Sequence, residues 1–367
     1  MNPPQLEVLS NPQMISSEKC LHPSNQLFVI GITGTNGKTT VSYLIGKVLE
    51  AAGHKPFVLG TLNSGSADLS TPIAKDIKTI MAAHLANGGT HFIMEVTSEG
   101  IHQSRVIDVE FNVKLLTNIT PDHLDYHKTF EIYKQVKLGF MIEGDSHKAY
   151  PKTYAKENIE FPTKLFGDFN LLNVKAAAYV LRYMGIAESA IRKTLSCCLP
   201  PSGRLESVDC GQPYLVFVDF AHTPDALENV LKTTKNIALR RGGRLFVLFG
   251  CGGNRDQIKR PEMGKIASEL ADYVVITEDN SRLESGLQIM ADIRQGIKLN
   301  KTNYILISNR REAINYVIDQ AKSSDVILLA GKGHETHQII GEEKAYFDDR
   351  VEAAKAINGS SKTSMQA

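Results

Sequence analysis

The sequence has no tryptophan, only five cysteines in 367 residues, and a formal net charge of just +1. The cysteines are odd in number and lack the spacing of metal ligands, so they indicate reduced thiols in a cytoplasmic protein. The near-zero net charge gives no reason to expect nucleic acid or a membrane as a partner. No apolar run reaches the length of a membrane span, and residues 1–5 do not resemble a secretory signal.

What the chain does contain is a repeated alternation of strand-like and helix-like apolar patterns. Its length, with 42% hydrophobic and 22% charged residues, suits two α/β domains, each with its own core. Pro, Ser, Asn and Gln dominate residues 1–26, which predicts an irregular arm. We expect domains at 27–199 and 200–358, separated by a break in the pattern near Leu199–Gly203, and a frayed tail at 359–367.

The alternation predicts parallel sheets covered by helices on both faces, the second of them a Rossmann-like doubly wound sheet. Strands are expected at 27–30, 56–60, 91–96, 109–118, 214–219, 244–249, 273–277, 303–307 and 325–330. Helices are expected at 41–50, 74–87, 129–141, 170–184, 223–239, 260–270, 286–298 and 309–321.

The segment Gly31–Thr40 lies between the first expected strand and the first expected helix. Glycines there let backbone N–H groups approach phosphates, and the helix N-terminus adds a positive field, as in P-loop ATPases. The generic spacing fails by one residue, because five residues separate Gly31 from Gly37, and an ordinary glycine turn is the alternative. The expected phosphate contacts are Gly34, Thr35, Asn36, Gly37, Lys38, Thr39 and Thr40.

Three further side chains stand out, each with a plain structural alternative. Glu95 ends a strand, where a carboxylate can hold Mg²⁺ or can simply face solvent. His123 follows another strand in the polar cluster Thr117–His127, but a lone histidine is most often structural. Lys137 falls within an expected helix, and taken alone it is typical of a solvated helix surface.

These segments and six others, in this order, resemble the Mur ligases over roughly residues 28–355. The others are Gly167–Asn173, Ser202–Glu206, Val218–Asp225, Gly250–Asp256, Asp279–Arg282 and Gly331–Glu335. Mur ligases are ATP-dependent enzymes that join an amino acid to a carboxylate through an amide bond. The resemblance is closest to the branch that adds the third amino acid, typically meso-diaminopimelate or lysine, to a muramoyl dipeptide precursor.

The resemblance implies two Mg²⁺ ions beside ATP. Thr39 and Glu95 would bind the first ion, and His123 and Lys137 the second. The matching lysine in the family is carbamylated (N6-carboxylated), which requires it to lose its proton, and burial favours that loss. Lys38 and the ions would neutralise charge during phosphoryl transfer.

The resemblance also assigns nucleotide contacts. Asn170 would read the adenine with support from Asn173, although Asn170 could equally cap a helix. Arg204 would lie near the phosphates, and Asp219 near the ribose or a metal-bound water. His222 could be functional, or could be a cap or a packing residue.

The resemblance also implies contacts for the carboxylate acceptor and for the amino acid. The acceptor would meet Ser98 and Arg105. The expected contacts of the amino acid are Arg255, Asp279, Asn280, Arg282, Gly331 and Glu335. Lysine-adding relatives lack the arginine that matches Arg282, whose planar fork suits a carboxylate, so the resemblance implies a dicarboxylic amino acid.

The chain departs from the family pattern in several places. Glu99 stands where the family usually has histidine, Phe220 where it commonly has tyrosine, and Ser281 where it has proline. Only about 27 residues precede the first strand, whereas full Mur ligases begin with a domain that holds a uridine nucleotide. We therefore expect a smaller carboxylate or peptide acceptor, or a partner subunit that supplies the missing domain.

The sequence thus predicts an ATP-dependent carboxylate–amine ligase that works through an acyl phosphate. One alternative is a ligase of the folylpolyglutamate or cyanophycin type, against which Arg282 and Gly331–Glu335 count. The other is a non-catalytic ATP-binding partner of another enzyme. The joint presence of Lys38, Thr39, Glu95, His123 and Lys137 argues against that second alternative.

Overall fold

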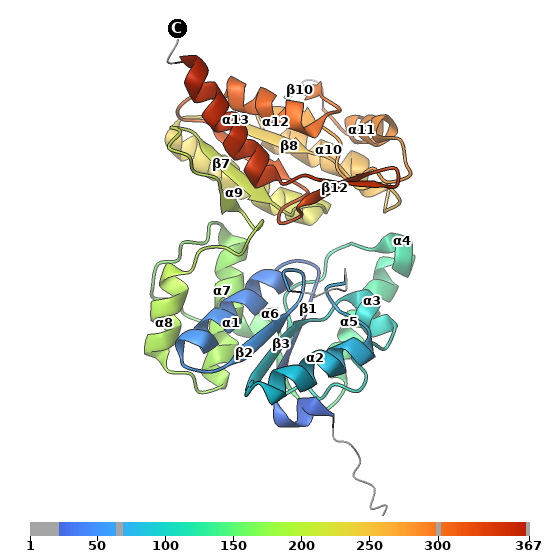
Figure 1. Cartoon of the computed structure of the whole chain (residues 1–367), viewed down its shortest axis with the longest axis vertical. Helices are drawn as coiled ribbons and strands as arrows, with labels where there is room; N and C mark the ends of the chain where they lie inside the picture. Colours follow the sequence, from blue (N-terminus) through green and yellow to red (C-terminus); the bar gives the residue numbers. More distant parts are fainter. Residues whose placement is uncertain (1–21, 64–68, 299–301, 365–367) are drawn as a thin grey trace, which may run out of the picture.

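The computed structural model describes residues 22–63, 69–298 and 302–364 as two α/β bodies stacked along the longest axis of the molecule (Figure 1). One body holds a five-stranded sheet in the order β2-β3-β1-β4-β5, and the other a six-stranded sheet in the order β10-β9-β8-β11-β7-β6. The strand pairs in both sheets are parallel except for β6 with β7. The predicted fold class is therefore confirmed.

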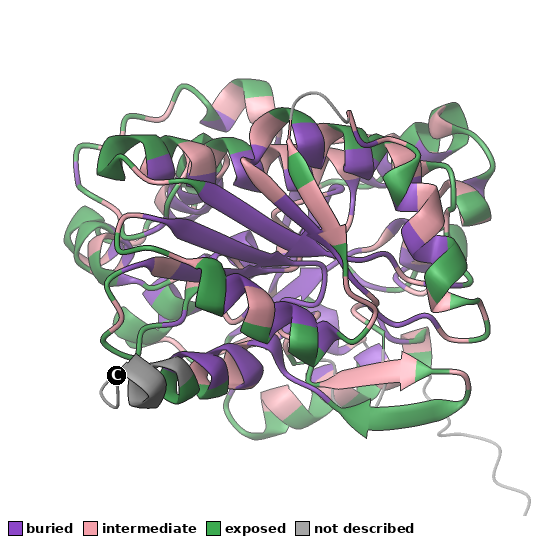
Figure 2. Cartoon of the chain, turned by 90° about the horizontal axis from the view of Figure 1, so that it is seen from above, coloured by how far each residue is buried: buried purple, intermediate pink, exposed green. Residues whose placement is uncertain are grey.

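Figure 2 views the molecule from the side of the second body and shows the buried strands of the six-stranded sheet in purple. The first sheet is likewise built from short strands, most of whose residues are buried. They are β1 (Phe28–Thr33), β2 (Pro56–Leu59), β3 (His91–Glu95), β4 (Val113–Leu116) and β5 (His147–Ala149). Three helices pack on one face: α1 (Lys38–Ala51), α7 (Asp168–Tyr183) and α8 (Glu188–Cys197). Two pack on the other: α2 (Ala74–Ala86) and α5 (Phe130–Ile142). Short helices complete this body: η1 (Pro23–Gln26), α3 (Ser98–His102), α4 (Leu124–His127) and α6 (Pro151–Tyr154).

The second sheet follows the same plan. Its strands are β6 (Glu206–Ser207), β7 (Leu215–Asp219), β8 (Leu245–Phe249), β9 (Tyr273–Ile276), β10 (Asn303–Leu306) and β11 (Val326–Ala330). One face carries α9 (Pro224–Arg241), α10 (Lys259–Leu270) and α11 (Gly286–Arg294). The other carries α12 (Arg310–Gln320) and α13 (Asp349–Ser364). A hairpin of β12 (His337–Ile340) and β13 (Glu343–Tyr346) lies between β11 and α13 in the chain.

The helix ends follow from local chemistry, as α9 illustrates. Thr223 caps its N-terminus by accepting a hydrogen bond from the Ala226 N–H, and Pro224 suits the first helical position. At the other end Gly242 adopts φ 68°, the left-handed conformation that ends helices, just after two arginines that complement the helix dipole.

The structure corrects the sequence prediction in three places. β1 continues through Thr33, so Gly31 belongs to the strand and the phosphate loop is Gly34–Gly37. A Cβ atom at Gly31 would lie 2.6 Å from Phe111 Cε1, so packing explains this glycine. β4 covers only part of the strand expected at 109–118. α13 continues to Ser364, although residues 359–367 were expected to be a frayed tail.

Every strand and helix expected between residues 214 and 330 is present, with ends shifted by a few residues. Of the arm expected at 1–26, residues 1–21 lie outside the described part, and the rest is the short helix η1 with its N-cap His22. Among the described residues, no helix is long and apolar enough to cross a membrane.

Candidate active site

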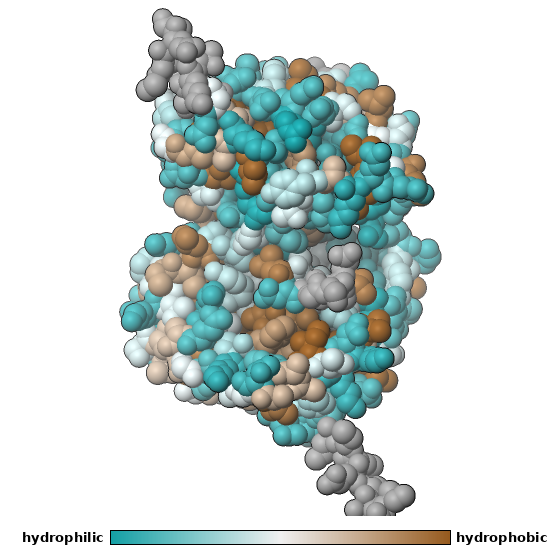
Figure 3. All heavy atoms as spheres, in the orientation of Figure 1, coloured by the Kyte–Doolittle hydropathy of each residue, from teal (hydrophilic) through white to brown (hydrophobic). Residues whose placement is uncertain are grey.

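A cavity of about 930 Å³ lies between the two bodies and is lined by both. The surface narrows at this boundary in Figure 3. The first body contributes the phosphate loop, Glu95 and His123, and the second contributes Arg204, Asp219 and the loops that follow β8 and β9. Strand ends point into the cavity, because the carboxyl ends of parallel strands meet at one edge of each sheet.

The phosphate loop has the geometry of an anion cradle. Gly34 and Gly37 adopt φ 140° and 87°, values that only glycine takes easily. A Cβ at Gly34 would lie 1.9 Å from Thr117 Oγ1, so the loop packs tightly against the end of β4. The N-terminus of α1 has no side-chain cap, which leaves its first N–H groups for an anion.

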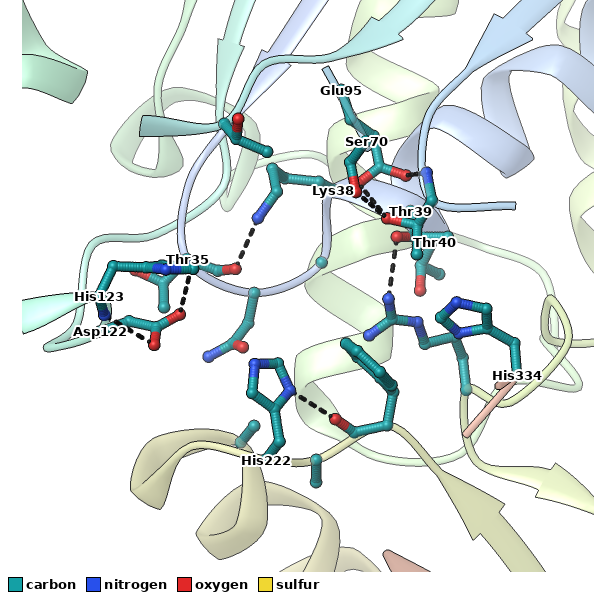
Figure 4. A pocket seen from close by; sticks show the side chains of 18 of the residues that line it. Thr35, Lys38, Thr39, Thr40, Ser70, Glu95, Asp122, His123, His222 and His334 are labelled. Atoms are coloured by element: carbon teal, nitrogen blue, oxygen red, sulfur yellow. Dashed lines mark hydrogen bonds and ion pairs between the residues drawn. The ribbon is translucent and has the colours of Figure 1, made fainter. Parts of the chain in front are cut away.

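Lys38 lies on the inner side of this loop, where Figure 4 shows it bonded to the loop backbone. Its Nζ donates to the carbonyl oxygens of Gly34 and Thr35, each at 2.8 Å. Burial lowers the pKa of Lys38, and the negative charges of Glu95 and Asp122 oppose that shift. The ammonium is thus held where a phosphate in the cradle would meet it.

Thr39 and Glu95 present oxygen atoms on one side of the cavity. Glu95 is buried, and its two oxygens accept hydrogen bonds from the Thr61 N–H at 2.9 Å and the Thr61 hydroxyl at 3.0 Å. The Thr39 hydroxyl accepts a hydrogen bond from Arg204 Nη2 at 3.0 Å. A carboxylate beside a hydroxyl suits Mg²⁺, which takes few protein ligands and completes its shell with phosphate and water.

His123 sits across the loop, held between two carboxylates. It adopts φ 54°, in the left-handed region, and its Nδ1 lies 2.8 Å from Glu99 Oε1. Its Nε2 lies 3.3 Å from Asp122 Oδ2. Burial lowers the pKa of His123, but the hydrogen bond to Glu99 and the charge of Asp122 outweigh it, so the pKa is raised.

Lys137 is buried, contrary to what its sequence alone suggested, and it does not line the cavity wall. Its Nζ donates to the Gly34 carbonyl at 2.9 Å and lies 4.9 Å from the centre of the Tyr133 ring. Burial, followed by the nearby Lys38 charge, lowers the pKa of Lys137 well below 10.5. The environment thus favours the uncharged amine.

Asn170 and Asn173 lie in the first turns of α7, against the phosphate loop. The N-cap of α7 is Gly167, so Asn170 does not have the capping role considered as its alternative. Asn170 Nδ2 donates to the Phe166 carbonyl at 2.9 Å, and Asn173 Nδ2 donates to Asn170 Oδ1 at 3.1 Å. Both side chains reach the cavity, with amide groups that can meet a nucleobase edge.

Arg204 and Asp219 belong to the second body and line the cavity near the phosphate loop. The Arg204 guanidinium lies 4.7 Å from the Phe220 ring centre, and within the described residues its Nε has no hydrogen-bond partner. Asp219 accepts hydrogen bonds from the Leu205 and Ala221 N–H groups. Burial raises the pKa of Asp219 to about 6, although Arg204 and these hydrogen bonds oppose the shift.

A basic and amide-rich group forms the far end of the cavity. Arg255, Arg282 and Glu335 line it, and burial together with the charge of Arg255 lowers the pKa of Arg282. Asn280 Nδ2 donates to Glu335 Oε2 at 2.8 Å. Lys332, which the sequence prediction missed although it lies inside Gly331–Glu335, donates to Asn280 Oδ1, Glu335 Oε2 and the His337 carbonyl.

Not every expected residue reaches the cavity. Asp279, Asn280, Gly331 and Ser98 lie behind its wall, together with Lys137. Arg105 does line the cavity, where its fork donates to the Thr71 carbonyl at 2.7 Å and to Gln103 Oε1 at 3.0 Å. Gln103 and Thr71 were not predicted, because neither residue type nor spacing distinguishes them in the sequence.

The described residues contain no group of three or more His, Cys, Asp and Glu side chains arranged to hold a metal ion. The expected ligand pairs do not form such a group, since each joins one carboxylate or imidazole to a threonine or lysine. They fit Mg²⁺ only together with phosphate and water oxygens.

Residues 32–150 match the family described as "Mur ligase middle domain", and residues 203–333 match "Mur ligase, glutamate ligase domain". Several relatives carry the name UDP-N-acetylmuramoyl-L-alanyl-D-glutamate--2,6-diaminopimelate ligase. One from Syntrophomonas wolfei is 34% identical, over 92% of this chain and 79% of the relative. One from Bacillus cereus is 36% identical over the same shares.

Solved structures give the same picture. A diaminopimelate ligase with the same name aligns with TM-score 0.56 at 30% identity, over 91% of this chain and 78% of that chain. Escherichia coli FolC in complex with DHPP and ADP aligns with TM-score 0.62 at 17% identity, over 95% of this chain and 94% of that chain. The second likeness bears on the fold alone.

Proposed function

The chain belongs to the Mur ligase family, and from this premise we propose how its cleft performs the reaction. It is an ATP-dependent, ADP-forming ligase that makes an amide bond between an amino acid and a carboxylate. The γ-phosphoryl group passes to the acceptor carboxylate, and ADP leaves. The amine then attacks the acyl carbon, the C–N bond forms, and the C–O bond to phosphate breaks.

The phosphate cradle is the observation that supports this assignment most strongly. The N-terminus of α1 and the Lys38 ammonium both lie at the phosphate loop, so backbone and side-chain donors would contact the β- and γ-phosphates there. Arg204 reaches the same point from the second body, with a guanidinium suited to the terminal phosphate. Asn170 and Asn173 lie beside the loop, where they would meet the adenine.

We assign two Mg²⁺ sites, one at Thr39 and Glu95 and one at His123 and Lys137, where bound ions would neutralise charge on the transferring phosphoryl group. Lys137 can serve only as a carbamate: its neutral amine attacks CO₂, the N–C bond forms, and one proton leaves. The lowered pKa of the buried amine supports this step. The Lys137 side chain must then turn from the Gly34 carbonyl toward the cavity.

The far end of the cavity fits a dicarboxylic amino acid. Arg255 and Arg282 offer two guanidinium groups for two carboxylates. Glu335, held by Asn280 and Lys332, can accept hydrogen bonds from a distal ammonium. The relatives' names specify 2,6-diaminopimelate, and we propose an amino acid of this class here. Asp279 and Gly331 support the loop from behind.

Arg105, with Ser98 behind it, would hold the acceptor near the phosphoryl group. The relatives' names give a UDP-N-acetylmuramoyl dipeptide as acceptor, and we propose that this chain uses a peptide or other small carboxylate of that kind. The unpaired cysteines among the described residues fit action in the cytoplasm.

The test is a mass-spectrometric screen with ATP and Mg²⁺. The purified chain is offered muramoyl dipeptide with and without its nucleotide, each with diaminopimelate, lysine or glutamate. We expect amide product with equimolar ADP for diaminopimelate, and none with a Lys38→Ala variant. A parallel reaction offers a folate acceptor with glutamate. ADP release without product, or product with the folate acceptor only, would overturn the assignment.

A further inference from the structure

We propose that Glu99 positions His123 for metal binding, by accepting a hydrogen bond from Nδ1 and so directing Nε2 to the ion. This inference rests on the second Mg²⁺ site proposed above. It gives a role to a carboxylate that lines the cavity but belongs to none of the expected ligand or substrate sets.

The contact itself is short and unambiguous. Glu99 Oε1 lies 2.8 Å from His123 Nδ1, and the side chains of Glu99 and His123 are 23% and 39% exposed, so the pair is partly shielded from water. Because an ionised carboxylate only accepts hydrogen bonds, Nδ1 must be the donor. A neutral imidazole with its proton on Nδ1 carries its free lone pair on Nε2.

Glu99 is well placed to impose this orientation. It lies in the first turn of α3, where Thr97 caps the helix by accepting a hydrogen bond from the Gly100 N–H. α3 follows directly after β3, which ends at Glu95, so one strand–helix junction supplies carboxylates to both proposed ion sites. The His123 ring also lies roughly parallel to the Tyr133 ring, and the two ring centroids are 6.5 Å apart.

Asp122 is the competing partner. Its Oδ2 lies 3.3 Å from His123 Nε2, while its Oδ1 accepts a hydrogen bond from the His123 backbone N–H at 2.9 Å. If Glu99 were absent, the ring proton could settle on Nε2 and point at Asp122, which would hide the lone pair from the ion. Carboxylates that fix the tautomer of a metal-bound histidine commonly contribute 10- to 100-fold in metal affinity.

The experiment uses Mn²⁺ as the probe and follows the free ion by electron paramagnetic resonance, with the full chain and ADP present. We expect Glu99→Ala to lower the affinity for the second Mn²⁺ ion by roughly 10-fold or more. Glu99→Gln should lower it less, because its amide oxygen can still accept the hydrogen bond from His123. Asp125→Asn, an exposed carboxylate on the same rim, is the matched control and should bind both ions like the unmodified chain.

A second measurement needs no Glu99 variant. In the metal-free unmodified chain at alkaline pH, imidazole ¹⁵N spectra should show His123 with its proton on Nδ1, the signal being identified by its loss in His123→Gln. A proton on Nε2 would overturn the proposal. So would normal Mn²⁺ affinity in Glu99→Ala when His123→Gln loses the second ion. If His123→Gln keeps that ion, the metal site proposed above is wrong, and this inference falls with it.

Discussion

The carbonyl oxygen of Gly34 accepts hydrogen bonds from two lysines, Lys38 at 2.8 Å and Lys137 at 2.9 Å. Burial lowers the pKa of both lysines, and at Lys137 repulsion from the Lys38 charge lowers it further. Conversion of Lys137 to a carbamate would replace that repulsion by attraction. The carbamate that we propose at Lys137 would thus be favoured electrostatically by Lys38.

Lys137→Ala should reduce turnover by roughly 100-fold or more, because it would remove a ligand of the proposed second Mg²⁺ site. Acetate should partly restore activity by supplying a carboxylate in the vacated space. In the unmodified chain, labelled bicarbonate should give a carbamate ¹³C signal that the variant lacks. Full activity of the variant without acetate would remove Lys137 from the mechanism.

Asp219 predicts a pH effect on stability. Burial raises its pKa to about 6 from the ordinary 3.8, so between these values the folded chain binds more protons than the unfolded chain. The contribution of Asp219 to the free energy of unfolding is therefore full below about pH 4 and is lost as the pH rises through about 6. In urea unfolding of the unmodified chain, the free energy of unfolding should therefore fall between about pH 4 and pH 6. The fall should be smaller in Asp219→Asn. Parallel pH profiles would contradict the assignment.

Arg282 predicts substrate selectivity. Arg282→Ala should cost about 2–4 kcal/mol in the preference for diaminopimelate over lysine, because the second carboxylate would lose its charged partner. The measurement is the ratio of kcat/KM for the two amino acids. Arg311→Ala, a partly exposed arginine paired with Glu352 away from the cavity, is a suitable control. Equal use of both amino acids by the unmodified enzyme would refute the role of Arg282.

Residue type and order predicted several polar groups that the structure places at the cavity wall, but not how far each one lies from the cavity. Arg255 and Glu335 line the wall as expected, whereas Asp279 and Gly331 lie behind it. Lys332 escaped prediction, because a buried lysine is recognisable only once its three acceptors are in place. Pairings between distant segments, such as Glu99 with His123, are likewise products of the fold.

At the scale of elements, two β–α units carry most of the phosphate- and metal-site residues that we propose in the first body. β1–α1 forms the phosphate cradle, and β3–α3 carries Glu95 and Glu99 beside it. Apolar periodicity predicted the long buried elements, since their burial follows directly from the pattern. It missed the hairpin β12–β13, because β12 is mostly half-buried, β13 is exposed, and neither strand has the run of buried apolar residues that marks a core strand. No helix was predicted at α13, and its last residues were expected to be a tail because Gly and Ser are poor helix formers.

The boundary between strand and loop at Gly31 can be tested with two alanine substitutions. Gly31→Ala should lower the free energy of unfolding by about 1–3 kcal/mol, because its Cβ would overlap Phe111, while ATP affinity stays near normal. Gly34→Ala should weaken ATP binding strongly, since φ 140° is strained for alanine and Thr117 blocks the space. Urea unfolding and ATP titration separate the two effects, and loss of ATP binding in a folded Gly31→Ala variant would show that Gly31 belongs to the cradle.

On the scale of the whole molecule, two hydrogen bonds at the phosphate loop join the bodies. Arg204 Nη2 donates to Thr39 Oγ1 at 3.0 Å, and Asn36 Nδ2 donates to Asp225 Oδ2 at 2.7 Å. The partners in the first body are Asn36 in the phosphate loop and Thr39 in the first turn of α1, next to that loop.

Apolar contacts also cross the boundary, since the ring centroids of Phe166 and Phe217 lie 5.8 Å apart and Phe169 packs against the second core. Relative motion is the default for two domains unless their interface is large and hydrophobic. We therefore expect nucleotide binding to be coupled to the position of the second body through the atoms of the two hydrogen bonds.

Asp225→Ala should shift the nucleotide-free chain toward a more open arrangement. A hydrogen bond to a charged group contributes about 1.5–3 kcal/mol, and each 1.4 kcal/mol changes a population ratio tenfold. Small-angle scattering should then give a larger radius of gyration without nucleotide, and added ATP analogue and Mg²⁺ should compact the variant more than the unmodified chain. Glu228→Gln is the matched control, because Glu228 lies on the same helix but pairs with Lys232. An unchanged radius of gyration in Asp225→Ala would mean that Arg204 and the remaining contacts hold the two bodies together without Asp225.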